Sequence, residues 1–245
     1  KAGAAYIFHR TGTNTWDAGM KITAPDAQPN DYFGCSVSIS GDYAVAGAKE
    51  EPTAGGTGSA YIYHRTGTNT WDAGIKITAP DAQAGDIFGS AVSISGDYII
   101  VGAYQEDCGA GDPIANAGAA YIYRRIGTNV WDAGTKITAT DAQEIDIFGF
   151  SVCISGDYAI VGAYFEDGGI GDPLNNSGAA YIYHRTGTNS WEEITRITAT
   201  DAQAGDYFGN SVSINGEYAV IAANQKNGDT GAPVLKAGAV YLFRK

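Results

Sequence analysis

The chain has 245 residues, of which 34 are glycine and 44% are hydrophobic, so it is long enough for a sizeable core and too apolar for a disordered chain. Its formal net charge of -12 and its pI near 4.5, with no basic stripe, exclude nucleic acid as a partner. No apolar run approaches the roughly 18 residues of a membrane helix, so the sequence predicts no membrane span. The chain begins at Lys1 rather than at a methionine, which fits either a mature product or a fragment.

The first predicted elements are a strand at 3–10, "GAAYIFHR", and a second strand at 16–24 that begins at Trp16. A unit that opens on a Phe-Gly pair then recurs along the chain. The pairs begin at Phe33, Phe88, Phe148 and Phe208. The first spacing is 55 residues and the later ones are 60 residues, periods that are typical of propellers and solenoids.

Each complete unit predicts four short strands. In the second unit, 88–95 alternates between apolar and polar residues, and 98–103 is almost continuously apolar, as in a strand buried on both faces. A third strand at 118–125 and a Gly-Thr-Asn turn lead to a fourth strand at 131–140. Four antiparallel strands joined by tight turns predict the blade of an all-β propeller.

The repeated words resemble a known family. "FGFSVCISGDYAIVGA", residues 148–163, and its counterparts resemble the FG-GAP repeat of bacterial surface proteins and of the integrin α-subunit propeller. The resemblance covers essentially the whole chain. It implies a β-propeller whose innermost strands start at Phe-Gly and whose outermost strands carry the tryptophans. It also implies a binding or adhesion role without catalysis, outside the cell or at its surface.

Counting strands predicts one four-bladed domain over residues 1–245. The three complete blades are 33–80, 88–140 and 148–200. The fourth unit, 208–245, contains three strands, and we expect 16–24 to supply its outer strand. Pairing of the N- and C-terminal strands would then close the ring.

One strand is left over, because 3–10 and 238–245 are the same element. One interpretation is that the chain is part of a longer array. A second is that the spare strand pairs with another copy of the chain, which can propagate into a filament or surface layer. A third is a monomer whose spare strand is frayed.

Nothing in the sequence predicts catalysis. The aspartates two residues before each Phe-Gly pair recur in every unit, which favours turn caps over an active site. These aspartates are Asp31, Asp86, Asp146 and Asp206. No metal-binding, phosphate-binding or nucleophile motif is present, so we expect no enzyme activity and no obligatory cofactor. The three cysteines do not recur and predict no disulfide framework.

Calcium is the one metal that the resemblance raises. The short Ser-Gly-Asp turn leaves no room for the family's calcium loop between the first and second strands, because calcium needs six to eight oxygen ligands. The acidic residues instead gather in the loops at 104–118 and 164–178. Candidate ligands there are Glu106, Asp107, Asp112, Glu166, Asp167 and Asp172. The alternative, which we favour, is an acidic solvated loop without a metal.

These variable loops lie on one rim of the predicted propeller, where binding functions usually reside. Tyr104, Tyr164 and Phe165 place aromatic rings there, either to stack on a protein or glycan ligand or to pack between blades. The sequence therefore predicts a binding module that acts through its rim. The alternative is a structural subunit that binds copies of itself through the strand 3–10 or 238–245.

Overall fold

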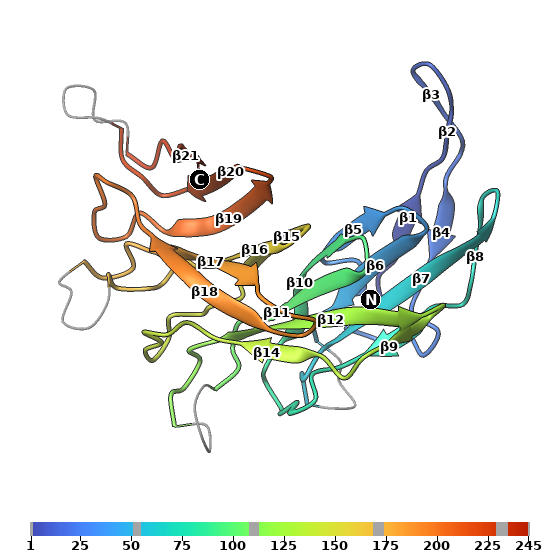
Figure 1. Cartoon of the computed structure of the whole chain (residues 1–245), viewed down its shortest axis with the longest axis horizontal. Coiled ribbons are helices and arrows are strands. Elements are labelled where there is room, and N and C mark those ends of the chain that lie inside the picture. Colours follow the sequence, from blue (N-terminus) through green and yellow to red (C-terminus); the bar gives the residue numbers. More distant parts are fainter. Residues whose placement is uncertain (1, 51–54, 108–112, 169–173, 229–234, 245) are drawn as a thin grey trace.

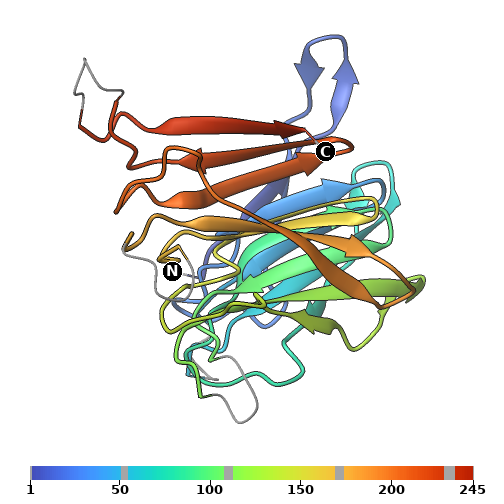
Figure 2. The same ribbon diagram turned by 60° about the vertical axis from the view of Figure 1, so that its left-hand side comes forward.

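The computed structural model describes residues 2–50, 55–107, 113–168, 174–228 and 235–244. These residues form β-strands and turns, with no helix among them, and the sheets follow one another along an arc (Figures 1 and 2). No segment of this described part is therefore a helix long and apolar enough to cross a membrane. The predicted all-β propeller architecture is confirmed.

Three blades are complete. Blade 1 consists of β5 (Val37–Ser40), β6 (Tyr43–Ala48), β7 (Ser59–Gly67), β8 (Thr70–Trp71) and β9 (Ile75–Ile77). Blade 2 consists of β10 (Phe88–Ser95), β11 (Tyr98–Ala103), β12 (Ala119–Gly127), β13 (Val130–Trp131) and β14 (Thr135–Ile137). Blade 3 consists of β15 (Ser151–Ser155), β16 (Tyr158–Ala163), β17 (Ala179–Arg185) and β18 (Trp191–Ile197).

The outer strand is split in blades 1 and 2 but continuous in blade 3. In blade 1, the carboxylate of Asp72 accepts hydrogen bonds from the backbone N–H groups of His64 and Gly74, both at 3.0 Å, and this turn interrupts the strand. Blade 3 has Glu192, Glu193 and Ile194 in place of that Asp-Ala-Gly turn, so β18 continues without a break.

Two partial sheets lie at the ends of the arc. The N-terminal half-blade consists of β1 (Ala5–Ile7), β2 (Arg10–Gly12), β3 (Thr15–Trp16) and β4 (Met20–Ile22). The C-terminal sheet consists of β19 (Phe208–Asn215), β20 (Tyr218–Ala223) and β21 (Ala239–Arg244).

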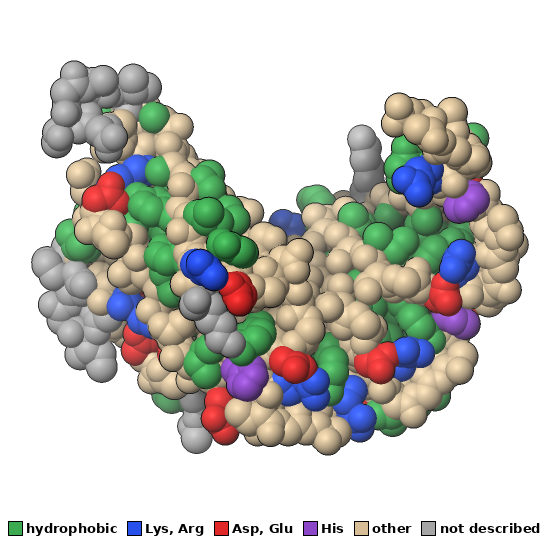
Figure 3. Space-filling model, turned by 45° about the horizontal axis from the view of Figure 1, so that its top comes forward, with side chains coloured by type: hydrophobic (Ala, Val, Ile, Leu, Met, Phe, Trp, Pro, Cys, Tyr) green, Lys and Arg blue, Asp and Glu red, His purple; other side chains and the backbone are tan. Residues whose placement is uncertain are grey.

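The predicted closure of the ring is not made in this structure. β4, within the segment 16–24, pairs with β1 rather than with β21, and β21 pairs with β20. The two ends of the arc stand apart, with a hollow between them (Figure 3). The physical reason is that β1 is chemically almost the same strand as β21 and lies directly before β4 in the chain, so it takes the edge that closure would require.

Successive blades pack face to face. Ile100 and Ile122 of blade 2 are buried in one cluster with Phe148 and Val152 of blade 3. The innermost strands also contact one another across the blades. Serine side chains of one inner strand accept hydrogen bonds from the next, as when Ser38 Oγ accepts from Ile94 N at 3.1 Å. Cys153 occupies this position in blade 3 and contacts Ile214 N in the same way, at 3.5 Å.

The Phe-Gly pair allows the closest contact between blades. Gly149 has φ 93°, and a Cβ there would lie 2.2 Å from the carbonyl oxygen of Ala119. Its own carbonyl oxygen lies where a Cβ on Gly102 of the preceding blade would need to be. Backbones of neighbouring blades therefore meet directly, and no other residue fits at either position.

Replacing this glycine tests the packing. We expect Gly149→Ala to lower the free energy of unfolding by about 3 kcal/mol or more, because strain and a backbone clash add together. Gly156→Ala is the matched control, since Gly156 also has positive φ but faces open space. It should cost about 1 kcal/mol in the same denaturant titration. Equal costs for the two variants would contradict the close-approach argument.

Candidate functional site

Five aromatic side chains gather on one rim of blades 2 and 3 and the C-terminal sheet. We call this group the aromatic rim cluster, and its members are Tyr104, Phe150, Tyr164, Phe165 and Tyr207. All five are partly exposed. They combine a rigid mutual packing with faces that remain open to solvent.

The rings form a continuous chain of edge-to-face and tilted contacts. Phe150 lies between Tyr104, at 5.5 Å between ring centroids, and Tyr164, at 4.4 Å. Tyr164 also contacts Phe165 at 4.4 Å and Tyr207 at 5.3 Å. Such geometries are the favourable ones for aromatic pairs, because the ring edge is positive and the ring face negative.

The blade architecture brings these rings together from separate turns. Tyr104 follows β11, whereas Tyr164 and Phe165 follow β16. Phe150 precedes β15, and Tyr207, which has the left-handed φ of 59°, precedes β19. The cluster therefore depends on the stacking of successive blades.

Sequence reasoning found Tyr104, Tyr164 and Phe165 but missed Phe150 and Tyr207. The signal for Phe150 is its place immediately after the Phe-Gly pair, where the other units carry Cys35, Ser90 and Asn210. A residue that differs among near-identical repeats marks a position that the scaffold leaves free to vary.

Glu106 and Glu166, the predicted acidic ligands, lie buried beside cations. Glu106 forms an ion pair with Lys136 on β14, and the side chain of Glu106 is 4% exposed. Glu166 forms an ion pair with Arg196 on β18 at 2.6 Å. Burial raises the pKa of each carboxyl, and the neighbouring cation opposes that rise. Both glutamates thus connect a rim loop to the outer strand of the same blade.

The aspartates beside them order the loops. Asp107 Oδ1 accepts a hydrogen bond from Asn116 N at 2.8 Å, and Asp167 Oδ1 accepts one from Asn176 N at 2.6 Å. Asp112 and Asp172 lie outside the described residues. Within the described part of the chain, no three acidic, histidine or cysteine side chains converge as metal ligands. Calcium binding by these loops stays a prediction.

The aspartates before the Phe-Gly pairs cap their turns, as predicted. Each accepts a hydrogen bond from the backbone N–H of the residue three positions earlier, as when Asp146 Oδ2 accepts from Gln143 N at 2.6 Å. Asp146 is buried, and burial raises its pKa to about 7. The nearby carboxylates of Glu166 and Asp141 act in the same direction.

Four stretches match the family model described as the FG-GAP repeat, namely residues 16–63, 71–123, 131–183 and 191–243. The chain belongs to the FG-GAP repeat family. Each matched FG-GAP unit begins at the tryptophan of one outer strand and ends in the third strand of the next sheet, so the unit links two neighbouring blades.

No curated protein sequence matches the chain significantly. Among solved structures, the chain is similar to one described as "Structure of YjhT", with 14% sequence identity and a TM-score of 0.45. The match covers 90% of this chain and 66% of that chain, which is slightly under two thirds of its length.

The buried carboxyl of Asp146 predicts a pH dependence of stability. A folded-state pKa of about 7 against an unfolded value of 3.8 means that the folded state holds this proton longer. Stability contributed here is therefore lost as the pH rises from about 4 to about 7. We expect Asp146→Asn, which retains an oxygen for Gln143 N, to reduce the fall in melting temperature between pH 5 and pH 7.5. Glu144→Gln, at an exposed site in the same link, is the control, and an equal fall in wild type and Asp146→Asn would contradict the assignment.

The calcium prediction has a direct check in thermal melting. Binding to the folded loops would raise the melting temperature as free calcium rises to millimolar levels, because a ligand of the folded state stabilises it by mass action. Asp107→Asn should diminish the rise. An unchanged melting temperature would mean that the loops are solvated and bind no calcium.

Proposed function

We propose that the chain is a non-enzymatic binding module, acting outside the cell or at its surface, that holds a protein or glycan ligand on the aromatic rim cluster. The single observation that carries this proposal is the cluster itself. Five partly exposed rings lie together on three neighbouring sheets. The first unit keeps a tyrosine, Tyr32, at the position of Tyr207 but has Cys35 and Lys49 at the positions of Phe150 and Tyr164, so the complete cluster is not a repeated feature of the scaffold.

The chemistry of the cluster suits an aromatic platform. Tyr164 and Tyr207 present an apolar face together with a hydroxyl group, which favours contacts with a sugar ring or with the side chains of a partner protein. The rings also support one another, so little conformational entropy is lost when a ligand binds. The family membership supports the same role, since FG-GAP propellers are binding modules in general.

Binding to a glycan array and to intact cells tests the proposal. We expect wild-type protein to bind at least one glycan or cell type, and we expect Tyr164→Ala and Tyr207→Ala to weaken that binding at least tenfold, a typical loss for a central aromatic contact. Ile126→Ala is the matched control, because Ile126 is an exposed apolar residue on a distant hairpin. Equal binding by wild type, the two tyrosine variants and the control would contradict a ligand site at the rim.

A second candidate function is a self-assembling structural subunit. It is favoured by the near-identity of β1 and β21 and by the unclosed ends of the arc. Electron microscopy of the purified protein separates the two candidates, since a subunit of this kind forms filaments or sheets and a rim-binding module remains as single particles.

A further inference from the structure

The interfaces between neighbouring blades, which we call seams, share one aromatic contact where both blades are complete. Tyr43 of blade 1 receives the edge of Trp131 from the outer strand of blade 2, at 5.8 Å between ring centroids and 87° between ring planes. Tyr98 of blade 2 receives Trp191 of blade 3 in the same way, at 5.7 Å and 80°. Each seam is therefore completed by a tryptophan that the next blade supplies.

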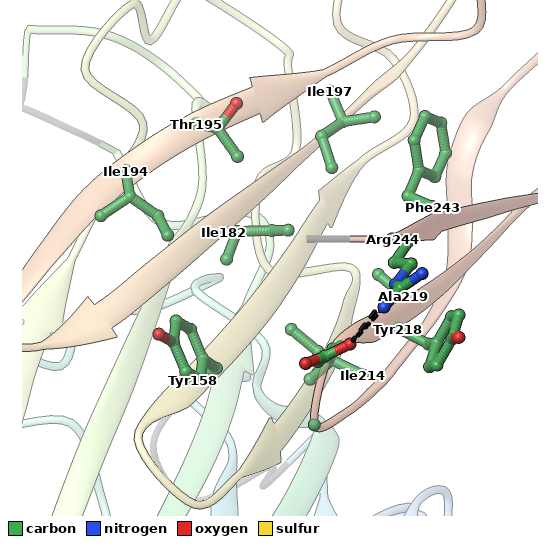
Figure 4. A pocket seen from close by; sticks show the side chains of 12 residues that line it. Tyr158, Ile182, Ile194, Thr195, Ile197, Ile214, Tyr218, Ala219, Phe243 and Arg244 are labelled. Atoms are coloured by element: carbon green, nitrogen blue, oxygen red, sulfur yellow. Dashed lines mark hydrogen bonds and ion pairs between the residues drawn. The ribbon is translucent and has the colours of Figure 1, made fainter.

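The third seam lacks its tryptophan. Tyr158 occupies the position of Tyr43 and Tyr98. The C-terminal sheet has no outer strand among its described residues, and a groove of about 230 Å³ lies beside Tyr158 instead. Tyr158, Ile182, Ile194, Ile214 and Phe243 line this groove (Figure 4). We call it the Tyr158 groove.

The tryptophan that fits this groove is Trp16. It stands on the β2–β3 hairpin at the position of Trp131 and Trp191, and 61% of its surface is exposed. The hairpin projects from the opposite end of the arc (Figures 1 and 3). The same chain therefore carries an unfilled aromatic slot at one end and an uncovered tryptophan at the other.

Charge complementarity points to the same pair of surfaces. In blade 2 and the link before it, Asp81 accepts hydrogen bonds from Tyr121, at 2.7 Å, and from Lys136 of the outer strand, at 2.9 Å. At the C-terminal sheet, Asp201 accepts from Tyr241 at 2.6 Å and shares Lys226 with Asp206, at 3.3 and 2.9 Å. Two carboxylates there face one cation, and among the described residues no outer strand adds a second cation. Lys21 on β4 is the counterpart of Lys136. It is exposed, and within the described part of the chain it forms no ion pair.

The sheet faces at the two ends are complementary as well. On the C-terminal sheet, Val220, Val240 and Leu242 are exposed. Their equivalents in blade 2 are buried against blade 3, and these are Ile100, Ala120 and Ile122. At the other end, Val37 and Ile39 are exposed, whereas their equivalents Val92 and Ile94 are buried against the preceding blade. Each end face therefore exposes the apolar residues that are buried between blades inside the chain, so the two end faces can pack against each other in the same way.

The occupant is a second copy of the chain. Within one chain the ends stand apart, and β1 holds the edge of β4, so Trp16 does not reach the Tyr158 groove. In a second copy, β21 of the first chain can replace β1 on β4 with like-for-like hydrogen bonds, because Ala5-Tyr6-Ile7 and Val240-Tyr241-Leu242 share one pattern. β1 is the strand that gives way, since only three of its residues pair with β4, whereas β21 stays anchored to β20 through six pairs at its other edge.

We propose that copies of this chain join head to tail, with Trp16 of one copy filling the Tyr158 groove of the next and with β4 completing the C-terminal sheet. This inference rests on the self-assembly candidate and names its joint. Because the exchanged strands bond equally, the driving force is burial of the two apolar faces together with the Tyr158–Trp16 contact. The joint is heterologous, so it generates a closed ring or an open filament.

Mixing two complementary variants tests the joint. Trp16→Ala removes the tryptophan that fills the groove and leaves the Tyr158 groove intact. Tyr158→Ala disrupts the groove and leaves Trp16 in place. We expect wild type to exceed the chain mass of 25.5 kDa increasingly with concentration in multi-angle light scattering. Each variant alone should remain monomeric, with the joint weakened about 100-fold. An equimolar mixture of the two should form a two-chain complex, because one intact joint remains between unlike copies.

Two further variants serve as a replacement for Tyr158→Ala and as a control. Ile194→Glu places a charge in the groove from an exposed position, so it replaces Tyr158→Ala if that variant does not fold. Val130→Ala, on the matching hairpin of blade 2, is the control and should assemble like wild type. Assembly that both Trp16→Ala and Ile194→Glu leave unchanged would overturn the joint but keep self-assembly. Wild type that stays monomeric at every concentration would overturn both, and a mixture that stays monomeric would overturn the head-to-tail geometry.

Discussion

The direct meeting of backbones at the Phe-Gly pairs is the constraint on which the rest of the structure depends. Gly149 of blade 3 packs against the carbonyl oxygen of Ala119, and the same contact recurs where Gly209 meets Ala179. Because no side chain separates the blades there, the serines of the inner strands reach the next blade. Each Phe ring is buried against two aromatic rings of the third strand that follows it, as Phe148 is against Tyr181 and Tyr183. The residues that repeat along the sequence, above all the Phe-Gly pairs, are those that this contact requires.

Positions that the contact does not constrain are where the units differ, and both proposals rest on them. The aromatic rim cluster occupies such positions. At another such position the charge is reversed between units. Glu106 and Glu166 each pair with a cation on the outer strand of their blade. The equivalent residue in the C-terminal sheet is Lys226, which pairs with Asp206 at 2.9 Å and with Asp201. The C-terminal sheet therefore supplies a cation of its own, and Asp201 and Asp206 share the single positive charge of Lys226.

Much of this architecture is predictable from the sequence, because a short period with repeated glycines, tyrosines and tryptophans has few physical solutions. The strands, the turn-capping aspartates and three members of the rim cluster follow from pattern alone. Closure does not, because 3–10 and 238–245 offer β4 nearly identical partners, and strand propensity cannot rank them. The ion pair between Glu106 and Lys136 was also missed, since only the folded blade brings 106 beside 136.

The central claim is that β1 and β21 are interchangeable partners of β4, and hydrogen exchange measures this directly. If copies join as proposed, raising the protein concentration exposes the amides of β1 and protects those of β21 in parallel, while β4 stays protected throughout. Exchange rates of β1 and β21 that do not change with concentration would contradict the account, because β1 would then remain on β4 in every state of the protein.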